Sequence, residues 1–371
     1  MKSLRFLVVE PLEPLAISRS MIGGIRFYAP VSVSFPVPQP TTVLGVLGSL
    51  LGASVPSGIS VNKLDDLKSV ARYVRNNLRC GVPLMKGPFL AVKDSPVRLY
   101  IPVGGDIYVP AEYAERAIRR VEGAGDPFFY VDLSLCYEES GYCIVAESTT
   151  MVGVSLKRTG NMDEKVVRPG YMYKYPLVTY LDLKERKPVD ACTVYVLNCE
   201  KGIGEAVARV GGEHRVALVR TVELSPNASG SVVSRVKNPL EDLEPGVYLA
   251  VSYVPIVPVS HNVITLDPSK LRGLEFLRIS EGDSGQIVGI PPLLKHTSAR
   301  LTRRAYISKI RVERLGLGYS EALGKRRPQV LALVPGTLVK LKRKASASSS
   351  SEIITTLWDI GYASLYKIQD A

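Results

Sequence analysis

The sequence predicts an α+β protein with two ferredoxin-like (RRM-like) domains, antiparallel sheets, insertions and a projecting β-hairpin. Helices with a clear apolar stripe interrupt the strands of the first third of the chain, and strand-like runs dominate after residue 128. The two types do not alternate steadily, as they would in a parallel barrel. Because 371 residues exceed the size at which one core usually stops growing, we expect domains at 1–205 and 206–371.

The N-terminal segment predicts strands at residues 4–9 and 31–35 and a helix at residues 41–52. The first strand is a β-branched and aromatic run that is closed by a charge and a proline. The helix opens from a proline-rich lead. A threonine, Thr41 or Thr42, suits its first turn as a cap, and Gly52 suits its end.

Two further helices are predicted from the spacing of apolar residues. Residues 62–79 place apolar side chains on one stripe with basic residues opposite, which is typical of an amphipathic helix. Residues 110–122 repeat the pattern, and Pro110 suits the first turn. On the first of these helices, Asp65 and Asp66 are expected to be a solvated pair rather than a metal site.

The rest of the chain predicts strands separated by turn signals. These strands span residues 128–135, 142–146, 177–183, 191–197, 216–222 and 247–253. Residues 345–351 form a serine-rich linker that is expected to be flexible. A short helix at residues 352–360, stopped by Gly361, and a strand at residues 363–368 complete the prediction.

The composition is that of a globular protein of the cell interior. Hydrophobic residues make up 46% and charged residues 22%, and no apolar run approaches the ~20 residues that cross a bilayer. The N-terminal run meets a charge and a proline too early for a signal peptide. We therefore expect a cytoplasmic protein without membrane contact, and its arginine and proline usage fits an archaeal thermophile.

The five cysteines show no metal-binding pattern. They contain no C-x-x-C pair, which zinc sites normally need. Cys136 with Cys143 and Cys192 with Cys199 share a C-x6-C spacing, which places the two members on opposite faces of a strand. We therefore expect buried free thiols rather than disulfides, and neither a metal nor a cofactor.

The net charge of +12 is concentrated in one segment. Residues 295–344 contain fourteen Lys or Arg against two acids, and the rest of the chain balances at 33 to 33. A localised basic segment on a neutral body is typical of a phosphate-binding surface, and the alternative is a solvated face with unpaired lysines. Its candidate nucleic-acid contacts are Lys295, His296, Arg300, Arg303, Arg304 and Arg311.

Two strands joined by a charged excursion predict a projecting hairpin at residues 152–177. Its cations suit a phosphate backbone, and its tyrosines suit base stacking. The alternative is an ordinary hairpin with core tyrosines. The candidate nucleic-acid contacts on this hairpin are Lys157, Arg158, Arg168, Tyr171, Tyr173 and Lys174.

Two glycine motifs add further candidates. A double glycine at residues 211–212 allows a close backbone approach beside Arg215, although this arginine can simply pair with Glu213. Gly316 and Gly318 can expose amide groups to a phosphate, and turn formation is the alternative explanation for them.

Five blocks then occur in a recognisable order. They are Glu10-Pro11-Leu12 with Arg19, the proline-rich lead at residues 35–45, the hairpin block at residues 152–173, the glycine block at residues 211–215 and the proline-glycine strand at residues 333–339. In this order they resemble the RAMP superfamily of CRISPR effector proteins. Within it, they are similar to the subunit of the type III-B Cmr complex that binds the 5′ tag of the CRISPR RNA (crRNA).

The resemblance implies a non-catalytic RNA-binding subunit of an RNA-guided antiviral effector complex. Such a subunit grips the crRNA 5′ tag and bridges the large polymerase-like subunit to a backbone RAMP subunit of the filament, with target RNA nearby. The resemblance also implies a thumb-like hairpin, which we place at residues 157–174, and adds Arg19, Thr41 and Thr42 to the candidate RNA contacts. Residues 300–327 and the serine linker match no part of the family pattern, so their role rests on charge alone.

The sequence contains none of the common catalytic motifs. It has no G-x-S-x-G, no P-loop lysine motif and no H-E-x-x-H, so we expect no enzymatic activity in this chain. One alternative is a crRNA-processing endoribonuclease of the same superfamily, in which His296 would accept a proton from a 2′-hydroxyl. Another is a non-CRISPR RNA-binding protein of ribosome or tRNA metabolism.

Overall fold

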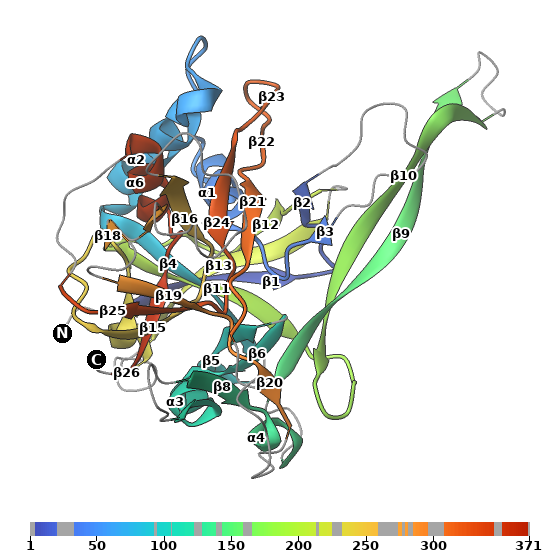
Figure 1. Cartoon of the computed structure of the whole chain (residues 1–371). Helices are drawn as coiled ribbons and strands as arrows, with labels where there is room; N and C mark the ends of the chain where they lie inside the picture. Colours follow the sequence, from blue (N-terminus) through green and yellow to red (C-terminus); the bar gives the residue numbers. More distant parts are fainter. Residues whose placement is uncertain are drawn as a thin grey trace.

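The computed structural model has a mixed α+β architecture built on antiparallel sheets, as the sequence predicts (Figure 1). The structure describes residues 4–20, 33–92, 95–104, 106–121, 128–138, 143–158, 165–212, 215–224, 232–258, 274–276, 279–280, 285–295, 308–344 and 351–369. None of the helices in these ranges is both long and apolar enough to span a membrane.

A nine-stranded antiparallel sheet forms the largest element, with strand order β10-β9-β6-β5-β4-β11-β1-β13-β12. Alternate residues of a strand face opposite sides of the sheet. Leu7 and Val9 of β1 accordingly pack in one hydrophobic cluster with the helices, and Phe6 packs in a second cluster on the other face. The strands are β1 (Leu4–Pro11), β4 (Cys80–Val92), β5 (Ser95–Gly104), β6 (Ile107–Pro110), β9 (Ile144–Arg158), β10 (Lys165–Asp182), β11 (Ala191–Cys199), β12 (Ala206–Arg209) and β13 (Val216–Leu224).

Two five-stranded sheets are formed mostly by the last third of the chain. One has the order β14-β26-β15-β25-β19, and the other has the order β18-β17-β16-β24-β21. Their strands are β14 (Val236–Lys237), β15 (Gly246–Ala250), β16 (Val254–Pro258), β17 (Leu274–Phe276), β18 (Ile279–Ser280), β19 (Gly285–Gly289), β21 (Val312–Gly316), β24 (Gln329–Leu333), β25 (Leu338–Leu341) and β26 (Leu365–Gln369).

Three small sheets lie around the larger ones. They are the ribbon of β2 (Ser18–Ser20) and β3 (Val33–Ser34), the three strands β20 (Leu293–Leu294), β8 (Phe128–Asp132) and β7 (Ile118–Val121), and the hairpin of β22 (Tyr319–Ser320) and β23 (Lys325–Arg326). Figure 1 shows the ribbon between β21 and the long β9–β10 hairpin.

The helices predicted at residues 41–52, 62–79 and 352–360 are confirmed as α1 (Pro40–Leu50), α2 (Asp65–Leu78) and α6 (Glu352–Asp359). Helix α1 packs closely on α2, because a Cβ on Gly48 would stand 2.6 Å from the side chain of Val70. Two ion pairs join α2 to α6. Lys68 Nζ lies 2.6 Å from Glu352, and Arg75 lies 2.5 Å from Asp359.

The predicted threonine cap of α1 is wrong. The N-cap is Gln39, which makes no side-chain capping bond, and Pro40 occupies the first turn. Proline has no N–H to satisfy and its φ suits the start of a helix, so the proline-rich lead itself sets this boundary. At the other end Gly52 adopts φ +77°, which agrees with its predicted role as the terminator.

The predicted helix at residues 110–122 is mostly wrong. Helical structure is limited to η2 (Ala111–Tyr113) and α3 (Ala114–Ala117), and the chain then becomes extended in β7. Strand β7 pairs with β8, with Arg119 opposite Tyr130. Pairing with a neighbouring strand therefore overrides the helical spacing of the sequence.

The strand predicted at residues 128–135 ends earlier, as β8, at Asp132. The Asp132 carboxylate accepts hydrogen bonds from the backbone N–H and hydroxyl of Ser134, at 3.0 and 2.6 Å. Such bonds favour a turn over a continued strand, and the short helix α4 (Ser134–Glu138) follows.

The expectation of free thiols is wrong for four cysteines. Disulfides join Cys80 to Cys199 and Cys136 to Cys143, and only Cys192 is free and buried. Cys80 opens β4 and Cys199 ends β11, and the register of these two strands places them opposite each other. Cys136 lies in α4 rather than on a strand, so the argument from opposite strand faces does not apply to it.

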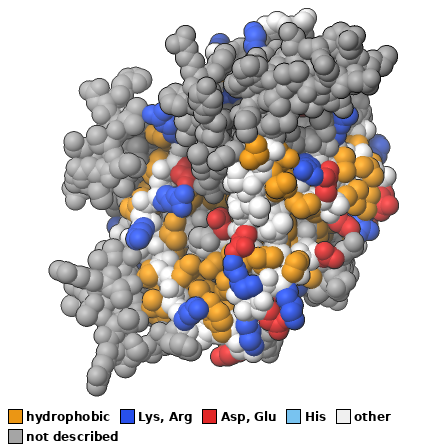
Figure 2. All heavy atoms as spheres, turned by 90° about the vertical axis from the view of Figure 1, so that its right-hand side faces the viewer, with side chains coloured by type: hydrophobic (Ala, Val, Ile, Leu, Met, Phe, Trp, Pro, Cys, Tyr) orange, Lys and Arg blue, Asp and Glu red, His pale blue; other side chains and the backbone are white. Residues whose placement is uncertain are grey.

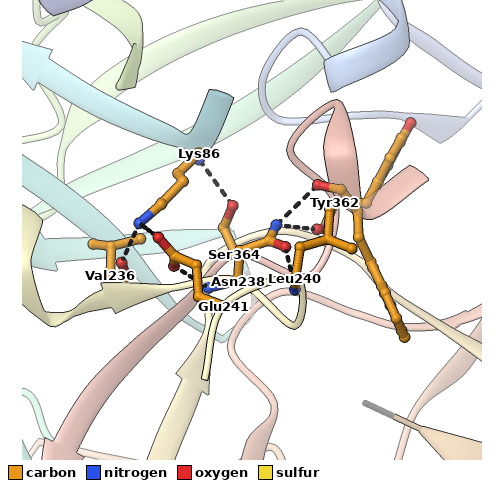
Figure 3. A network of polar contacts seen from close by, with 9 residues as sticks. Lys86, Val236, Asn238, Leu240, Glu241, Tyr362 and Ser364 are labelled. Atoms are coloured by element: carbon orange, nitrogen blue, oxygen red, sulfur yellow. Dashed lines mark hydrogen bonds and ion pairs between the residues drawn. The ribbon is translucent and has the colours of Figure 1, made fainter. Parts of the chain in front are cut away.

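A buried polar network joins the end of the chain to the large sheet (Figure 3). The amide of Asn238 donates to the carbonyls of Trp358 and Tyr362, at 2.9 and 3.3 Å. Lys86 of β4 donates to Glu241 at 2.6 Å, and Glu241 also accepts from the backbone N–H of Asn238. These bonds fix the turn after α6 against β4.

The division into two ferredoxin-like domains stays a prediction. Strands β12 and β13 follow the predicted boundary at residue 205, yet they belong to the nine-stranded sheet through β1. The hydrophobic cluster around Leu44 of α1 also contains Tyr253, Leu357 and Tyr362. The two halves of the sequence therefore share a core.

Candidate nucleic-acid interface

The predicted projecting hairpin is present as β9 and β10, the longest strands of the described chain. Their register runs from Asp182 opposite Ile144 to Lys165 opposite Arg158, with an irregularity between Val167 and Met172. Figure 1 shows the pair leaving the body as a two-stranded arm. Strand β6 pairs with β9 only at Ile144 and Val145, the first two residues of β9. In the described chain, no third strand pairs with the outer part of the arm.

The outer part of this arm carries the predicted hairpin contacts. From Ser148 to Val152 the side chains of β9 are exposed, so the arm has left the core before the basic block begins. The strands beyond this point contain Lys157, Arg158, Arg168, Tyr171, Tyr173 and Lys174. Their side chains and residues 159–164 lie outside what the structure describes, so these contacts stay predictions.

The glycine block lies at the root of the arm. A Cβ on Gly211 would stand 2.5 Å from the carbonyl oxygen of Ala16, and the N–H of Gly212 donates to the same oxygen at 2.7 Å. The close backbone approach that the double glycine predicts is therefore made by the chain itself. Leu15, beside this contact, bridges to Val178 of β10.

Arg215 is held at the same root. Its guanidinium donates to Glu13, which also accepts from the N–H of Val216. The bond to Glu13 raises the pKa of Arg215, and a contact with Tyr175 of β10 adds to the effect. Among the described residues, the ion-pair partner of Arg215 is Glu13, which the sequence analysis missed, and the pair joins the root of the arm to the N-terminal segment. Glu213, the partner that the sequence suggests, lies outside the described residues.

The ribbon of β2 and β3 connects the arm to the basic segment. Strand β3 contacts β10, and β2 contacts β21. Arg19 lies in the middle of β2. Three segments that are far apart in the sequence, the arm, the ribbon and residues 312–316, therefore meet on one side of the molecule.

Residues 309–333 of the basic segment form a ridge of β21, β24 and the β22–β23 hairpin. Lys309, Arg311 and Arg314 are exposed, and Arg311 lies 2.5 Å from Glu313. Gly316 pairs with Gln329 in the strand ladder. Gly318 has φ +82°, so turn formation explains this glycine, and its role in phosphate binding stays a prediction.

The expected solvated pair at residues 65–66 is wrong for Asp66. This side chain is fully buried and accepts a 2.8 Å bond from Arg327 Nε. The same guanidinium donates to the carbonyls of Leu317 and Tyr319, at 3.3 and 3.0 Å. Asp66 and Arg327 are 261 residues apart, so helix periodicity alone could not reveal the pair.

The two threonines of the family block lie at the start of α1. Thr41 is buried, with its hydroxyl 3.4 Å from that of Tyr362, whereas Thr42 is half-buried. Burial raises the pKa of Tyr362 to about 12, against a smaller lowering by the bond with Thr41. Thr41 therefore has a packing role here, and contact with RNA stays a prediction for both threonines.

Lys295 is not part of this group. It follows β20, at the opposite end of the molecule from β22 and β23 in Figure 1, and its amino group lies 4.5 Å from the centre of the Tyr137 ring. The remaining candidates of the basic segment, His296, Arg300, Arg303 and Arg304, lie outside the described residues.

Figure 2 shows the side of the molecule from which the arm projects. On its described surface, Lys and Arg side chains stand between hydrophobic ones, with Asp and Glu among them. A cleft of about 260 Å³ at the root of the arm is lined mainly by apolar residues and by Glu10, Glu13 and Asp190. The three carboxylates of this cleft would repel phosphate, so the cleft does not suit a phosphate ligand.

Within the described ranges, no group of three or more His, Cys, Asp or Glu side chains could hold a metal ion. The strands that the structure brings together around the ribbon contain cations, glycines and tyrosines in their sequences, together with Glu313 of β21. Such a set can bind phosphate and stack on bases.

Comparison with solved structures identifies the fold. One chain of a structure described as type III-B Cmr-beta bound to cognate target RNA matches with a TM-score of 0.55 and 17% identity, covering 98% of this chain and 96% of that chain. This protein has the fold of a Cmr-complex chain. A second chain, from Cmr-beta bound to cognate target RNA and AMPPnP, matches with a TM-score of 0.53 and 17% identity over 98% and 99% of the two chains. No protein-family model matches the Cmr-like chain, and no curated protein matches it.

Proposed function

We propose that this protein is a non-catalytic RNA-binding subunit of a type III-B CRISPR effector complex and that it grips the 5′ tag of the crRNA. The observation that carries the proposal is the convergence of the β9–β10 arm, the β2–β3 ribbon and β21 on one side of the molecule. Each of these segments contains predicted RNA contacts. The likeness to Cmr-complex chains over almost the whole length supports the same function.

The arm and the ridge have complementary roles in this proposal. Cations on the ridge supply affinity through phosphates and read little sequence. Tyrosines on the arm stack on splayed bases of a single strand, and 2′-hydroxyl contacts distinguish RNA from DNA. Specificity for the tag therefore depends on the arm more than on the ridge.

The proposed partners are the large polymerase-like subunit and a backbone RAMP subunit, with target RNA nearby. The two similar chains come from structures that contain cognate target RNA. Because the convergent side chains are suited to binding rather than to proton transfer, we propose that other subunits carry out any RNA cleavage.

A binding and cleavage assay tests the proposal. Purified protein is mixed, without divalent metal, with end-labelled crRNA that carries either the natural tag or a scrambled one, and in parallel with an end-labelled crRNA precursor that keeps the whole repeat. A native gel reports binding and a denaturing gel reports cleavage. We expect tighter binding of the natural tag and intact RNA. Equal binding of both RNAs would contradict tag recognition. Cleavage at the repeat that is lost in His296→Ala would instead identify a processing endoribonuclease.

A shortened arm provides the decisive variant. Val152 and Lys174 are opposite each other across the arm, so residues 153–173 can be replaced by an Asn-Gly turn without disturbing the root. We expect natural-tag binding to weaken about ten-fold or more, since several stacking contacts are lost together. Arg119→Glu on β7, an exposed site away from the arm, is the matched control and should bind as the wild type does.

A further inference from the structure

The β22–β23 hairpin presents an aromatic side chain to solvent. Tyr319 is 53% exposed, whereas nearly all other aromatic side chains in the described part of the chain are buried or half-buried. The other exposed tyrosine, Tyr73, is tied by a hydroxyl bond to the carbonyl of Leu51. In Figure 1 the hairpin projects beyond β21 and β24.

One cation of this hairpin, Arg326, lies on the same face as the exposed ring. Tyr319 is directly opposite Arg326, and Ser320 is opposite Lys325. Residues opposite each other in an antiparallel pair place their side chains on the same face. Arg326 therefore extends on the same face as the Tyr319 ring, while Ser320 is buried on the other face and Lys325 is exposed.

Arg327 fixes the orientation of the hairpin. Its backbone N–H donates to Gly318 at 3.0 Å, closing the hairpin, and its guanidinium bonds to the carbonyls of Leu317 and Tyr319 and to buried Asp66 of α2. One side chain thus joins both strands of the hairpin to a core helix. Breaking this pair would leave the buried Asp66 carboxylate without its counter-charge, so a turned hairpin is costly and the pair favours one direction.

From this arrangement we infer that the β22–β23 hairpin is a second binding site for single-stranded RNA, separate from the arm. An unpaired base stacks on the Tyr319 ring, and Arg326, on the same face, contacts an adjoining phosphate. The surroundings favour RNA over a protein partner, because Glu321 is the only acid in the hairpin and no large exposed apolar side chain other than Tyr319 lies between residues 318 and 327. Asp66 and Arg327 act as positioning residues. The inference extends the proposed RNA-binding function to a site outside the family pattern.

The test separates this site from the arm. The full chain and the shortened-arm variant are each titrated with a fluorescent single-stranded oligouridine that lacks the tag, and binding is followed by anisotropy. In both backgrounds we expect Tyr319→Ala to weaken binding about ten-fold and Tyr319→Phe to change it less than two-fold, because stacking needs the ring but not the hydroxyl. Equal affinity of Tyr319→Ala and wild type would overturn the inference.

Crosslinking gives a readout that a purely structural role would not move. The oligouridine is replaced by one containing 4-thiouridine, and the crosslinked peptide is identified after irradiation. We expect a crosslink within residues 318–327, and we expect its yield to fall in Asp66→Asn even where overall folding is unchanged. Crosslinks that map only elsewhere would overturn the inference.

Guide and target RNA are the two possible sources of the unpaired nucleotide. Two samples are compared: thiouridine-labelled crRNA alone, and thiouridine-labelled target RNA paired to unlabelled crRNA. The sample in which the β22–β23 hairpin is crosslinked identifies the source of the nucleotide. If wild-type protein bound natural and scrambled tags equally, but Tyr319→Ala still weakened oligouridine binding, the proposed tag function would be overturned and this site would remain supported. The reverse result would overturn the site alone.

Discussion

The two projecting hairpins of the molecule are held in opposite ways. The β9–β10 arm is long, and beyond Val152 it is stabilised in the described chain by the pairing of its own two strands. The β22–β23 hairpin is short, and a buried ion pair between Arg327 and Asp66 joins it to a core helix. The β9–β10 arm therefore extends far from the body, whereas the buried ion pair fixes the orientation of the β22–β23 hairpin relative to helix α2.

The difference is also visible at the roots. The root of the arm is secured by partly exposed contacts such as Arg215 with Glu13, and the root of the short hairpin is secured inside the core. Exposed ion pairs contribute little to stability, and a half-broken buried pair is strongly destabilising. Substitutions at the two roots should therefore differ in their effect on the free energy of unfolding.

The largest expected effect is that of Asp66→Ala, which leaves the Arg327 charge buried without its partner. We expect the free energy of unfolding to fall by about 3–5 kcal/mol, measured by urea denaturation. The matched control is Asp65→Ala, which removes a partly exposed carboxylate 3.2 Å from Lys68 and should cost less than about 1 kcal/mol. Similar urea midpoints for Asp66→Ala and Asp65→Ala would contradict the claim that the buried Asp66–Arg327 pair anchors the short hairpin.

Alkaline pH should lower the free energy of unfolding through two buried tyrosines, Tyr362 and Tyr180. Burial raises the pKa of Tyr362, near Arg327, to about 12, and burial also raises the pKa of Tyr180 in β10. Below pH 10 folded and unfolded chains both keep these protons. Above pH 10 the unfolded chain loses them first, so stability should fall by about 1.4 kcal/mol per pH unit for each group until its folded pKa is reached. Urea denaturation of Tyr362→Phe should show a shallower loss between pH 10 and 12, and an unchanged slope would refute this.

A smaller effect is expected from Glu13→Ala at the root of the arm. The change removes a charged hydrogen bond from half-buried Arg215, so we expect a loss of about 1–2 kcal/mol in the free energy of unfolding. Glu147→Ala serves as the control, because Glu147 of β9 forms a solvent-exposed ion pair with Arg186. This change should lower the free energy of unfolding by less than about 0.5 kcal/mol. A loss at Glu13 as large as that at Asp66 would show that both hairpins are anchored alike.

The smallest effect on stability is expected from shortening the arm itself. Replacing residues 153–173 with Asn-Gly removes strand pairs that begin beyond the exposed stretch at 148–152, so we expect a change within about 1 kcal/mol in the free energy of unfolding. The same variant should lose most of its affinity for tagged RNA. A large drop in the thermal midpoint would mean that the arm supports the core.

Local sequence patterns were sufficient to predict an element whose apolar spacing alone determines its secondary structure. Helix α2 follows from a single apolar stripe, and the arm follows from two strand-like runs around a charged excursion. The helix predicted after Pro110 failed for the opposite reason. Residues 118–121 pair with β8, and a partner strand cannot be read from helical spacing.

The candidate site was only partly predictable for a similar reason. The cations and tyrosines of the arm and ridge are visible in the sequence, but their convergence depends on β2 and β3, which are only three and two residues long. The partners Asp66 and Arg327 are separated by 261 residues, and Glu13 and Arg215 by 202. Pairing over such distances is decided by topology, so the positions that fix the hairpins could not be found from local patterns.

The disulfide between Cys80 and Cys199 has a consequence for the integrity of the arm. The bond closes a covalent ring between residues 119 apart, and both strands of the arm lie within that ring. A single proteolytic cut in the arm would therefore leave the two fragments covalently joined until the bond is reduced. After reduction, only the shared sheet and core would hold the two fragments together.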